Sequence, residues 1–184
     1  MEGRSTPTFD VEPLRGVGPV RLGMTRDESR AAMGLPFESF QKSPGDAALT
    51  DAYLDSSFQV FFDREDRVDF IELSAGPDCV ALYRGTPVLE LPAEEAVALL
   101  ARDAAPDLSE PEDETSVVFP ALELSLWRPF APDDEGDDPF DDDEDWSDSG
   151  YEPIELEPEE QGYDGRTYAT IGVGKRGYFS SRSA

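Results

Sequence analysis

The chain contains no histidine and only one cysteine among its 184 residues. Without histidine it cannot carry Ser-His-Asp or Cys-His catalysis, a histidine general base or histidine-ligated zinc. Cys79 cannot form an internal disulfide, and we interpret it as a small core thiol in a reducing compartment. We therefore predict no catalytic residue, no metal site and no cofactor, and a protein that is not an enzyme. The one enzymatic alternative left open is a hydrolase whose metal is held by carboxylates.

Basic residues are also scarce. Lys and Arg number 15 against 42 Asp and Glu, which gives a formal net charge of −27. Sixteen of the acids lie between Asp133 and Glu160, where there is no Lys or Arg, so the rest of the chain carries −11. Such a field attracts basic partners and repels nucleic acid and anionic membranes. An acidic loop that only keeps the protein soluble would have the same composition, and this alternative stays open.

Long apolar runs are missing as well. No segment approaches the ~18 apolar residues that a membrane span needs, and the first 13 residues lack the apolar core of a signal peptide. We predict a cytoplasmic protein. The length fits one domain covering 1–184.

The clearest structural signal is a hairpin at Phe58–Ser74, two apolar runs around a charged turn. Folding it so that Phe62 lies opposite Val68 predicts one buried face and a second, less buried face. The predicted buried face holds Phe58, Val60, Phe62, Val68 and Phe70, and the other face holds Phe61, Ile71 and Leu73.

Two helices are expected. Thr25 and Glu28 form a capping box before a short helix at 26–33, which would end at Gly34. A second helix would begin at Pro92 and continue through 93–102. The apolar stripe of the second helix comprises Ala93, Ala96, Val97 and Leu100.

Further extended segments are expected at 53–54, 80–83, 87–91, 121–127 and 167–173. Sliding the chain by 67 residues superposes 22–28 on 89–95, which predicts two repeat-like halves, about 16–76 and 77–179. The second half would contain a long acidic loop at 129–166 between its last two strands. The fold class is α+β, an antiparallel sheet with two short helices packed on one face.

The stretch LGMTRDE at 22–28, followed by Gly34 and the hairpin, resembles the GMT-type repeat of the BamE-like and beta-lactamase-inhibitor-protein group. That resemblance implies small α+β units in which a helical element packs on an antiparallel sheet, sometimes in tandem. The chain lacks the disulfides of the secreted inhibitors and the lipoprotein signal of BamE. It also resembles small acidic bacterial proteins of actinobacterial type, some of which are immunity proteins against toxins.

Two motif matches do not indicate sites. Gly172–Gly177 (GVGKRG) fits a dinucleotide fingerprint, but the seven residues after it cannot supply the required βαβ unit. We interpret it as the end of a strand before a loose tail, with Lys175 offsetting the acidic loop. The start of an EF-hand loop at Asp145 fails because its twelfth position is Leu156.

Aromatic side chains interleaved with carboxylates in the acidic loop favour docking on a basic protein. We therefore predict a non-enzymatic inhibitor of the immunity type that neutralises a basic toxin or enzyme, as in a toxin–antitoxin pair. The alternative is a structural or regulatory accessory subunit that binds through an exposed sheet face, while the acidic loop only keeps the protein soluble. A separate alternative for the aromatic side chains is that they only tether the loop to its own domain. The sequence predicts no oligomeric state. The predicted partner-binding residues are Asp137, Asp138, Phe140, Asp141, Asp142, Asp143, Glu144, Asp145, Trp146, Asp148 and Tyr151.

Overall fold

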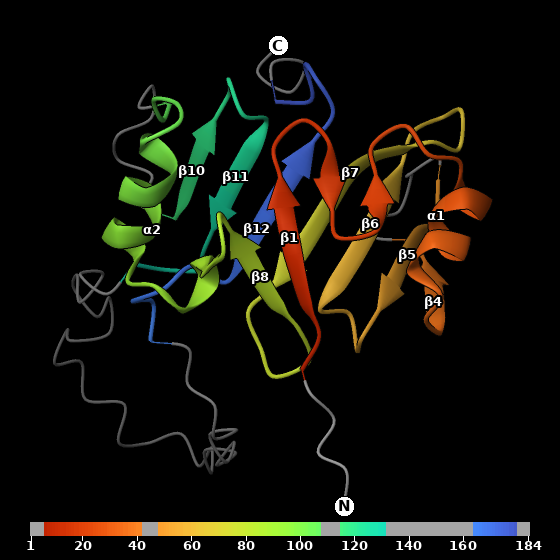
Figure 1. Cartoon of the computed structure of the whole chain (residues 1–184), viewed down its shortest axis with the longest axis horizontal. Coiled ribbons are helices and arrows are strands. Elements are labelled where there is room, and N and C mark those ends of the chain that lie inside the picture. The colour runs from red at the N-terminus through yellow and green to blue at the C-terminus, as the bar shows by residue number, and fades with distance from the viewer. Residues whose placement is uncertain (1–5, 42–47, 108–114, 132–163, 180–184) are drawn as a thin grey trace, which may run out of the picture.

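The structure, a computed structural model, describes residues 6–41, 48–107, 115–131 and 164–179. These residues form two α-helices and two sheets, which confirms the α+β class (Figure 1). The helices are α1 (Arg26–Met33) and α2 (Ala93–Ala101). The seven-stranded sheet runs in the order β10 (Ser116–Phe119), β11 (Leu124–Trp127), β12 (Thr170–Gly174), β7 (Val68–Ser74), β6 (Phe58–Phe62), β5 (Thr50–Tyr53) and β4 (Phe37–Phe40).

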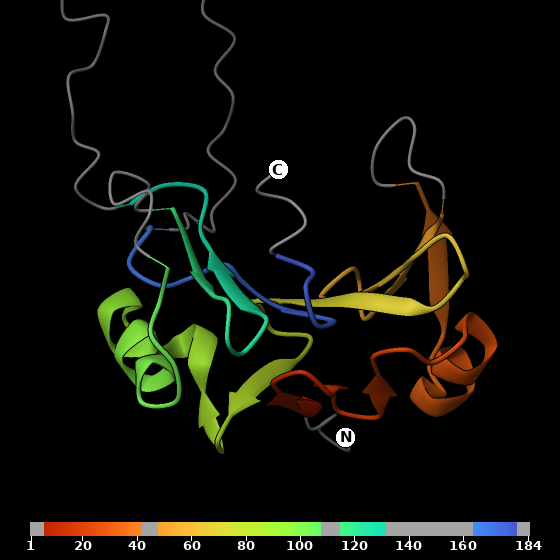
Figure 2. The same cartoon turned by 90° about the horizontal axis from the view of Figure 1, so that it is seen from above.

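A second sheet was not predicted. It runs in the order β3 (Val20–Arg21), β2 (Gly16–Val17), β1 (Thr8–Glu12), β8 (Val80–Tyr83) and β9 (Thr86–Pro87). Its β1–β8 pair is parallel, with Phe9 opposite Ala81. Seen from above, this sheet and both helices lie on the same side of the seven-stranded sheet, with β1 and β8 between the two helices (Figure 2). The core fills the space between these layers, and the opposite face of the seven-stranded sheet, hereafter the open face, has no helix over it among the described residues.

The predicted hairpin is present as β6 and β7, with Phe62 opposite Val68. The assignment of its faces is wrong in part. The register shifts after Phe61, which pairs with Phe70, so that Asp69 is an additional residue in β7. This bulge sends Phe70 to the open face and turns Ile71 and Leu73, both fully buried, into the core.

The first helix follows its local signals. Thr25 accepts a hydrogen bond from the Glu28 backbone N–H at 3.3 Å, and Glu28 accepts one from the Thr25 N–H at 2.8 Å. Gly34 ends the helix with a φ of 64°, in the left-handed region that glycine adopts without a Cβ clash. The capping box and the helix end are confirmed.

The second helix begins at Ala93, so Pro92 is its N-cap and not its first residue. It ends at Ala101, one residue before the predicted end. Residues Val88–Glu90, predicted as extended, form a 3-10 turn. The buried residues of α2 are Ala93, Ala96, Leu99 and Leu100, so Leu99 takes the place predicted for Val97.

The predicted strand at 121–127 begins only at Leu124 because the residues before it turn the chain from β10 into β11. Leu122 donates a backbone hydrogen bond to Phe119, and Glu123 has a φ of 49°. The strand predicted at 167–173 begins at Thr170 and pairs with both β11 and β7. Strands β12 and β7 therefore join the two predicted halves of the chain, and the tandem repeat itself stays a prediction.

Candidate functional site

The predicted partner-binding residues, 137–151, lie outside the described residues. Of the predicted acidic loop at 129–166, the structure describes residues 129–131 and 164–166, the two ends. These two ends and the sheet that holds them form the described part of the candidate site.

The two ends are joined by a buried arginine. The Arg128 side chain follows β11 and donates a hydrogen bond from Nη1 to the Gly165 carbonyl at 2.7 Å, and its guanidinium lies 5.4 Å from the centre of the Tyr168 ring. Next to it, the Ala169 N–H donates to the Trp127 carbonyl at 2.8 Å. We call residues 133–160, with their sixteen acids, the acidic segment. The chain therefore leaves the sheet before this segment and returns to it afterwards at neighbouring points, next to Arg128.

Two exposed aromatic residues flank this place. Trp127 is 46% exposed and Phe130 is 42% exposed. Since Leu124 and Leu126 are fully buried, the alternation along β11 directs Trp127 to the open face. The Phe130 ring lies against Gly165, where an added Cβ would come within 3.0 Å of it. Neither residue is among the predicted partner-binding residues, although Phe130 is one of the aromatic side chains of the predicted acidic loop and Trp127 ends the strand before that loop.

The middle of the open face is an aromatic cluster covered by the end of the chain. Tyr178 stacks on Phe70 with 4.7 Å between ring centres, and the centre of the Phe61 ring lies 5.4 Å from that of Phe70. Gly172 makes room for this ring, because a Cβ there would stand 2.2 Å from Phe70 Cζ. Phe70 is consequently 7% exposed.

The described end of the chain is held by specific contacts. The buried Glu123 carboxylate accepts hydrogen bonds from the backbone N–H groups of Gly177 and Phe179, and Lys175 Nζ lies 2.8 Å from Asp63 Oδ2. The GVGKRG stretch thus ends β12 and turns back over the sheet up to residue 179. In the described part of the chain, Lys175 pairs with Asp63 in the β6–β7 turn; the expectation that it also offsets the acidic loop stays a prediction.

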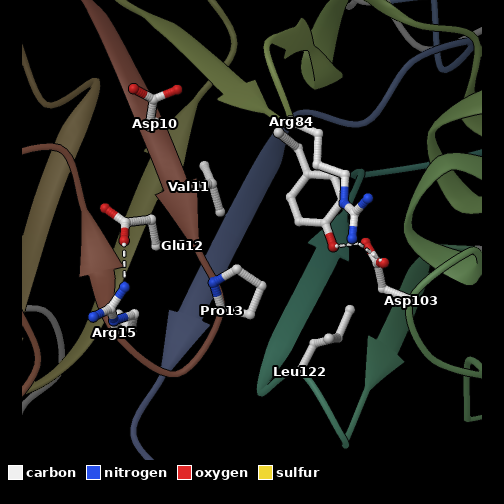
Figure 3. A pocket seen from close by; sticks show the side chains of 9 residues that line it. Asp10, Val11, Glu12, Pro13, Arg15, Arg84, Asp103 and Leu122 are labelled. Atoms are coloured by element: carbon white, nitrogen blue, oxygen red, sulfur yellow. Dashed lines mark hydrogen bonds and ion pairs between the residues drawn. The ribbon is translucent and has the colours of Figure 1, made fainter.

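A cleft of about 610 Å³ opens on the other side of the molecule, lined by Val11, Pro13 and Leu122 and by several charged groups (Figure 3). Its charges are largely paired. Asp103 accepts hydrogen bonds from Tyr83 Oη at 2.6 Å and from Arg84, and Arg15 lies 3.5 Å from Glu12. Burial, followed by the hydrogen bond to Asp103, raises the pKa of Tyr83 to about 12, so it stays protonated. The cleft presents no activated nucleophile and little net charge to select a ligand.

The fully buried carboxylate of Asp51 fastens α1 to the sheet. It accepts hydrogen bonds from Arg26 at 2.8 Å, from Arg30 at 2.7 and 2.9 Å and from Ser39 at 2.6 Å. Burial alone would raise the pKa of Asp51, but the hydrogen bonds from Arg30 and Ser39 and the two positive charges outweigh it and lower the pKa. Because these hydrogen bonds join α1 to β5 and β5 to β4, we interpret the cluster as structural.

Few of the remaining described groups could act as a nucleophile or hold a metal ion. Burial, with a contribution from Asp78, raises the pKa of Cys79 to about 11, so the thiol is a poor nucleophile. In the described ranges, no group of three or more Cys, Asp or Glu side chains is arranged to hold a metal ion. None of the helices in the described part is long and apolar enough to cross a bilayer.

Comparison with protein families, with curated proteins and with solved structures yields no match to this chain. The resemblance to the BamE-like and beta-lactamase-inhibitor-protein group stays a prediction from the sequence.

Proposed function

We propose that this chain is a non-enzymatic binding protein of the inhibitor or immunity type, whose partner is a basic protein. The observation that carries the proposal is the pair of exposed rings, Trp127 and Phe130, at the place where a segment with sixteen acids and no base leaves and rejoins the sheet. Exposed tryptophan is among the commonest anchors of protein interfaces. The carboxylates supply the complementary charge.

The two components would act on different steps. The acidic segment would raise the association rate by long-range attraction, an effect that falls steeply with salt. The rings would lower the dissociation rate, because buried apolar contacts are little affected by screening. Arg128 would keep both components at one end of the sheet.

The absence of histidine from the chain, the raised pKa of Cys79 and the paired charges of the cleft favour binding over catalysis. A second candidate, an accessory subunit that binds through the open face, is favoured by the aromatic cluster of Phe61 and Phe70. Tyr178 already covers much of Phe70, so this alternative depends mainly on Phe61.

The test is affinity capture from the native cell at low salt, with elution by salt. Four forms of the protein are used as bait: the full chain, a chain lacking 133–160, Trp127→Ala with Phe130→Ala, and Phe61→Ala. We expect a basic protein that the full chain and Phe61→Ala retain and the other two lose. Poly-lysine is the control for charge alone, and it should bind the double variant as well as the full chain.

A partner retained by the deleted chain would refute the proposal. A partner that only Phe61→Ala fails to retain would establish the accessory-subunit alternative. A partner that binds all forms in proportion to their net charge would show that the segment is a general polyanion without a specific site.

A further inference from the structure

The edge strand β4 combines two features that soluble proteins usually avoid together. It is the last strand of the seven-stranded sheet, and no described strand pairs with its outer side. All four of its residues are exposed, and its pairing with β5 is regular, without a bulge. At the opposite edge, the Asp107 N–H donates to the Val118 carbonyl of β10 at 2.7 Å, so that edge is partly covered. An open, regular edge is a template for a further strand.

Exposed apolar side chains gather at the same edge. In the described part of the chain, seven large hydrophobic residues are at least 36% exposed, and four of these belong to β4 or lie close to its ends and those of β5. These four are Leu35, Phe37, Phe40 and Leu49. Their clustering at one edge, and not over the whole surface, is typical of an interaction site.

We propose that β4 pairs antiparallel with β4 of a second copy of this chain, which joins the two seven-stranded sheets into one. Such an interface is isologous and closes at a dimer. In the proposed dimer both copies have their helices on the same side of the joined sheet. Residues that lie opposite each other across the two β4 strands must then have the same number parity, so the twofold axis passes through one residue position.

The charge on β4 selects among these registers. An axis at Glu38 would place two carboxylates directly opposite each other, which is unfavourable. With the axis at Ser39, all of β4 takes part in the pairing. Ser39 then lies opposite Ser39 of the second copy, and Phe40 lies opposite Glu38 of the second copy. We therefore assign the register centred on Ser39, in which the two Phe40 rings are diagonal neighbours within reach of each other.

Electrostatics permit this pairing despite the net charge of −27. The acidic segment rejoins the sheet at β12, which is four strands away from β4. At about 4.8 Å per strand, this point of attachment lies roughly 19 Å from β4, more than twice the Debye length of about 8 Å at physiological salt. Glu38 is the only charged residue between Leu35 and Gln41, so the edge itself carries little charge. Added salt should therefore strengthen the dimer, whereas it would weaken binding of a basic partner.

The experiment is sedimentation equilibrium of the full chain, from about 10 µM to about 1 mM, at low salt and at about 0.5 M salt, since a small interface gives a weak dimer. We expect the average mass to rise above 20.2 kDa with concentration, and to rise further at high salt. Hydrogen exchange at residues 37–41 should slow under the same conditions.

Two variants at one position test the register. Phe40→Glu and Phe40→Lys both remove the ring, but in the proposed register only glutamate meets Glu38 of the second copy with a like charge. We expect Phe40→Glu to stay monomeric and Phe40→Lys to associate at least ten times more tightly than Phe40→Glu. Trp127→Glu, which removes an exposed ring at the other end of the sheet, should dimerise like the unmodified chain.

If the unmodified chain keeps an average mass of 20.2 kDa at the highest concentration, the proposal is wrong. It is also wrong if Phe40→Glu dimerises like the unmodified chain. Loss of association in both Phe40 variants overturns the register, because an axis at Phe40 would set each new charge against itself. Phe40 is already 37% exposed, so all variants should melt like the parent, and a melting curve checks this.

Discussion

Replacing the buried carboxylate of Asp51 by an amide should destabilise the protein by about 3 kcal/mol. Asp51→Asn keeps the shape but removes the charge that faces Arg26 and Arg30, and it presents N–H donors to groups that are themselves donors. Removing one partner of a buried ion pair typically costs ~3–5 kcal/mol. The side chains of Arg26 and Arg30 are 13% and 28% exposed and can regain some hydration, which favours the lower end of that range.

The assay is urea unfolding at neutral pH, supported by a thermal melt. For a chain of this size each kcal/mol corresponds to ~2–4 °C, so about 3 kcal/mol should lower Tm by roughly 6–12 °C. Asp66→Asn is the matched control. Asp66 lies 2.7 Å from the same Arg26, but its side chain is 58% exposed, so its loss should cost less than about 1 kcal/mol.

The pH dependence gives an independent check. Since the pKa of Asp51 in the folded state is lower than its ordinary value of 3.8, its contribution is fully present above that value and is lost as the pH falls through the folded pKa. The difference in unfolding free energy between the parent and Asp51→Asn should be constant from about pH 5 to 8 and shrink below about pH 4. A loss under ~1 kcal/mol, or equal losses for the two variants, would refute the view that Asp51 fastens α1 to the sheet.

Three further outcomes test the packing. Gly172→Ala should cost about 1–3 kcal/mol in urea unfolding because the new methyl meets the Phe70 ring, and the cost should be smaller in a Phe70→Ala background. Thr25→Ala should cost about 1 kcal/mol through loss of the capping box, and an unchanged midpoint would contradict the role given to it. Cys79, 3% exposed and with a pKa of about 11, should not react with a thiol reagent at about pH 8 until denaturant is added; rapid labelling of the native protein would contradict its burial.

Local signals made part of the fold predictable. Thr25, Glu28 and Gly34 determine where α1 starts and stops through contacts a few residues apart, so the sequence predicts both ends of the helix correctly. The β6–β7 pairing was also readable. The face of Phe70 was not, because it depends on a bulge at Asp69 that a strict alternation cannot contain.

Long-range pairing explains most of what was missed. Phe9 and Ala81 are neighbours in a parallel pair although they are 72 positions apart, and strands as short as Gly16–Val17 carry no periodic signal of their own. At the candidate site, the acidic charge was plain from composition. The position of Phe130 beside Gly165 was not, because the acidic residues separate the two in the sequence.

The arrangement of the sheet bears on how the two proposed interfaces would work together. Trp127 lies beside β12 and Phe40 lies on β4, with β7, β6 and β5 between them, so binding at one end need not disturb the other. Pairing through β4 would then direct the two acidic ends away from each other, and each end could take its own basic partner. The expected stoichiometry is one partner per chain in both monomer and dimer. A partner that bound only one chain of the dimer, or that dissociated it, would show that the two ends compete for the same surface.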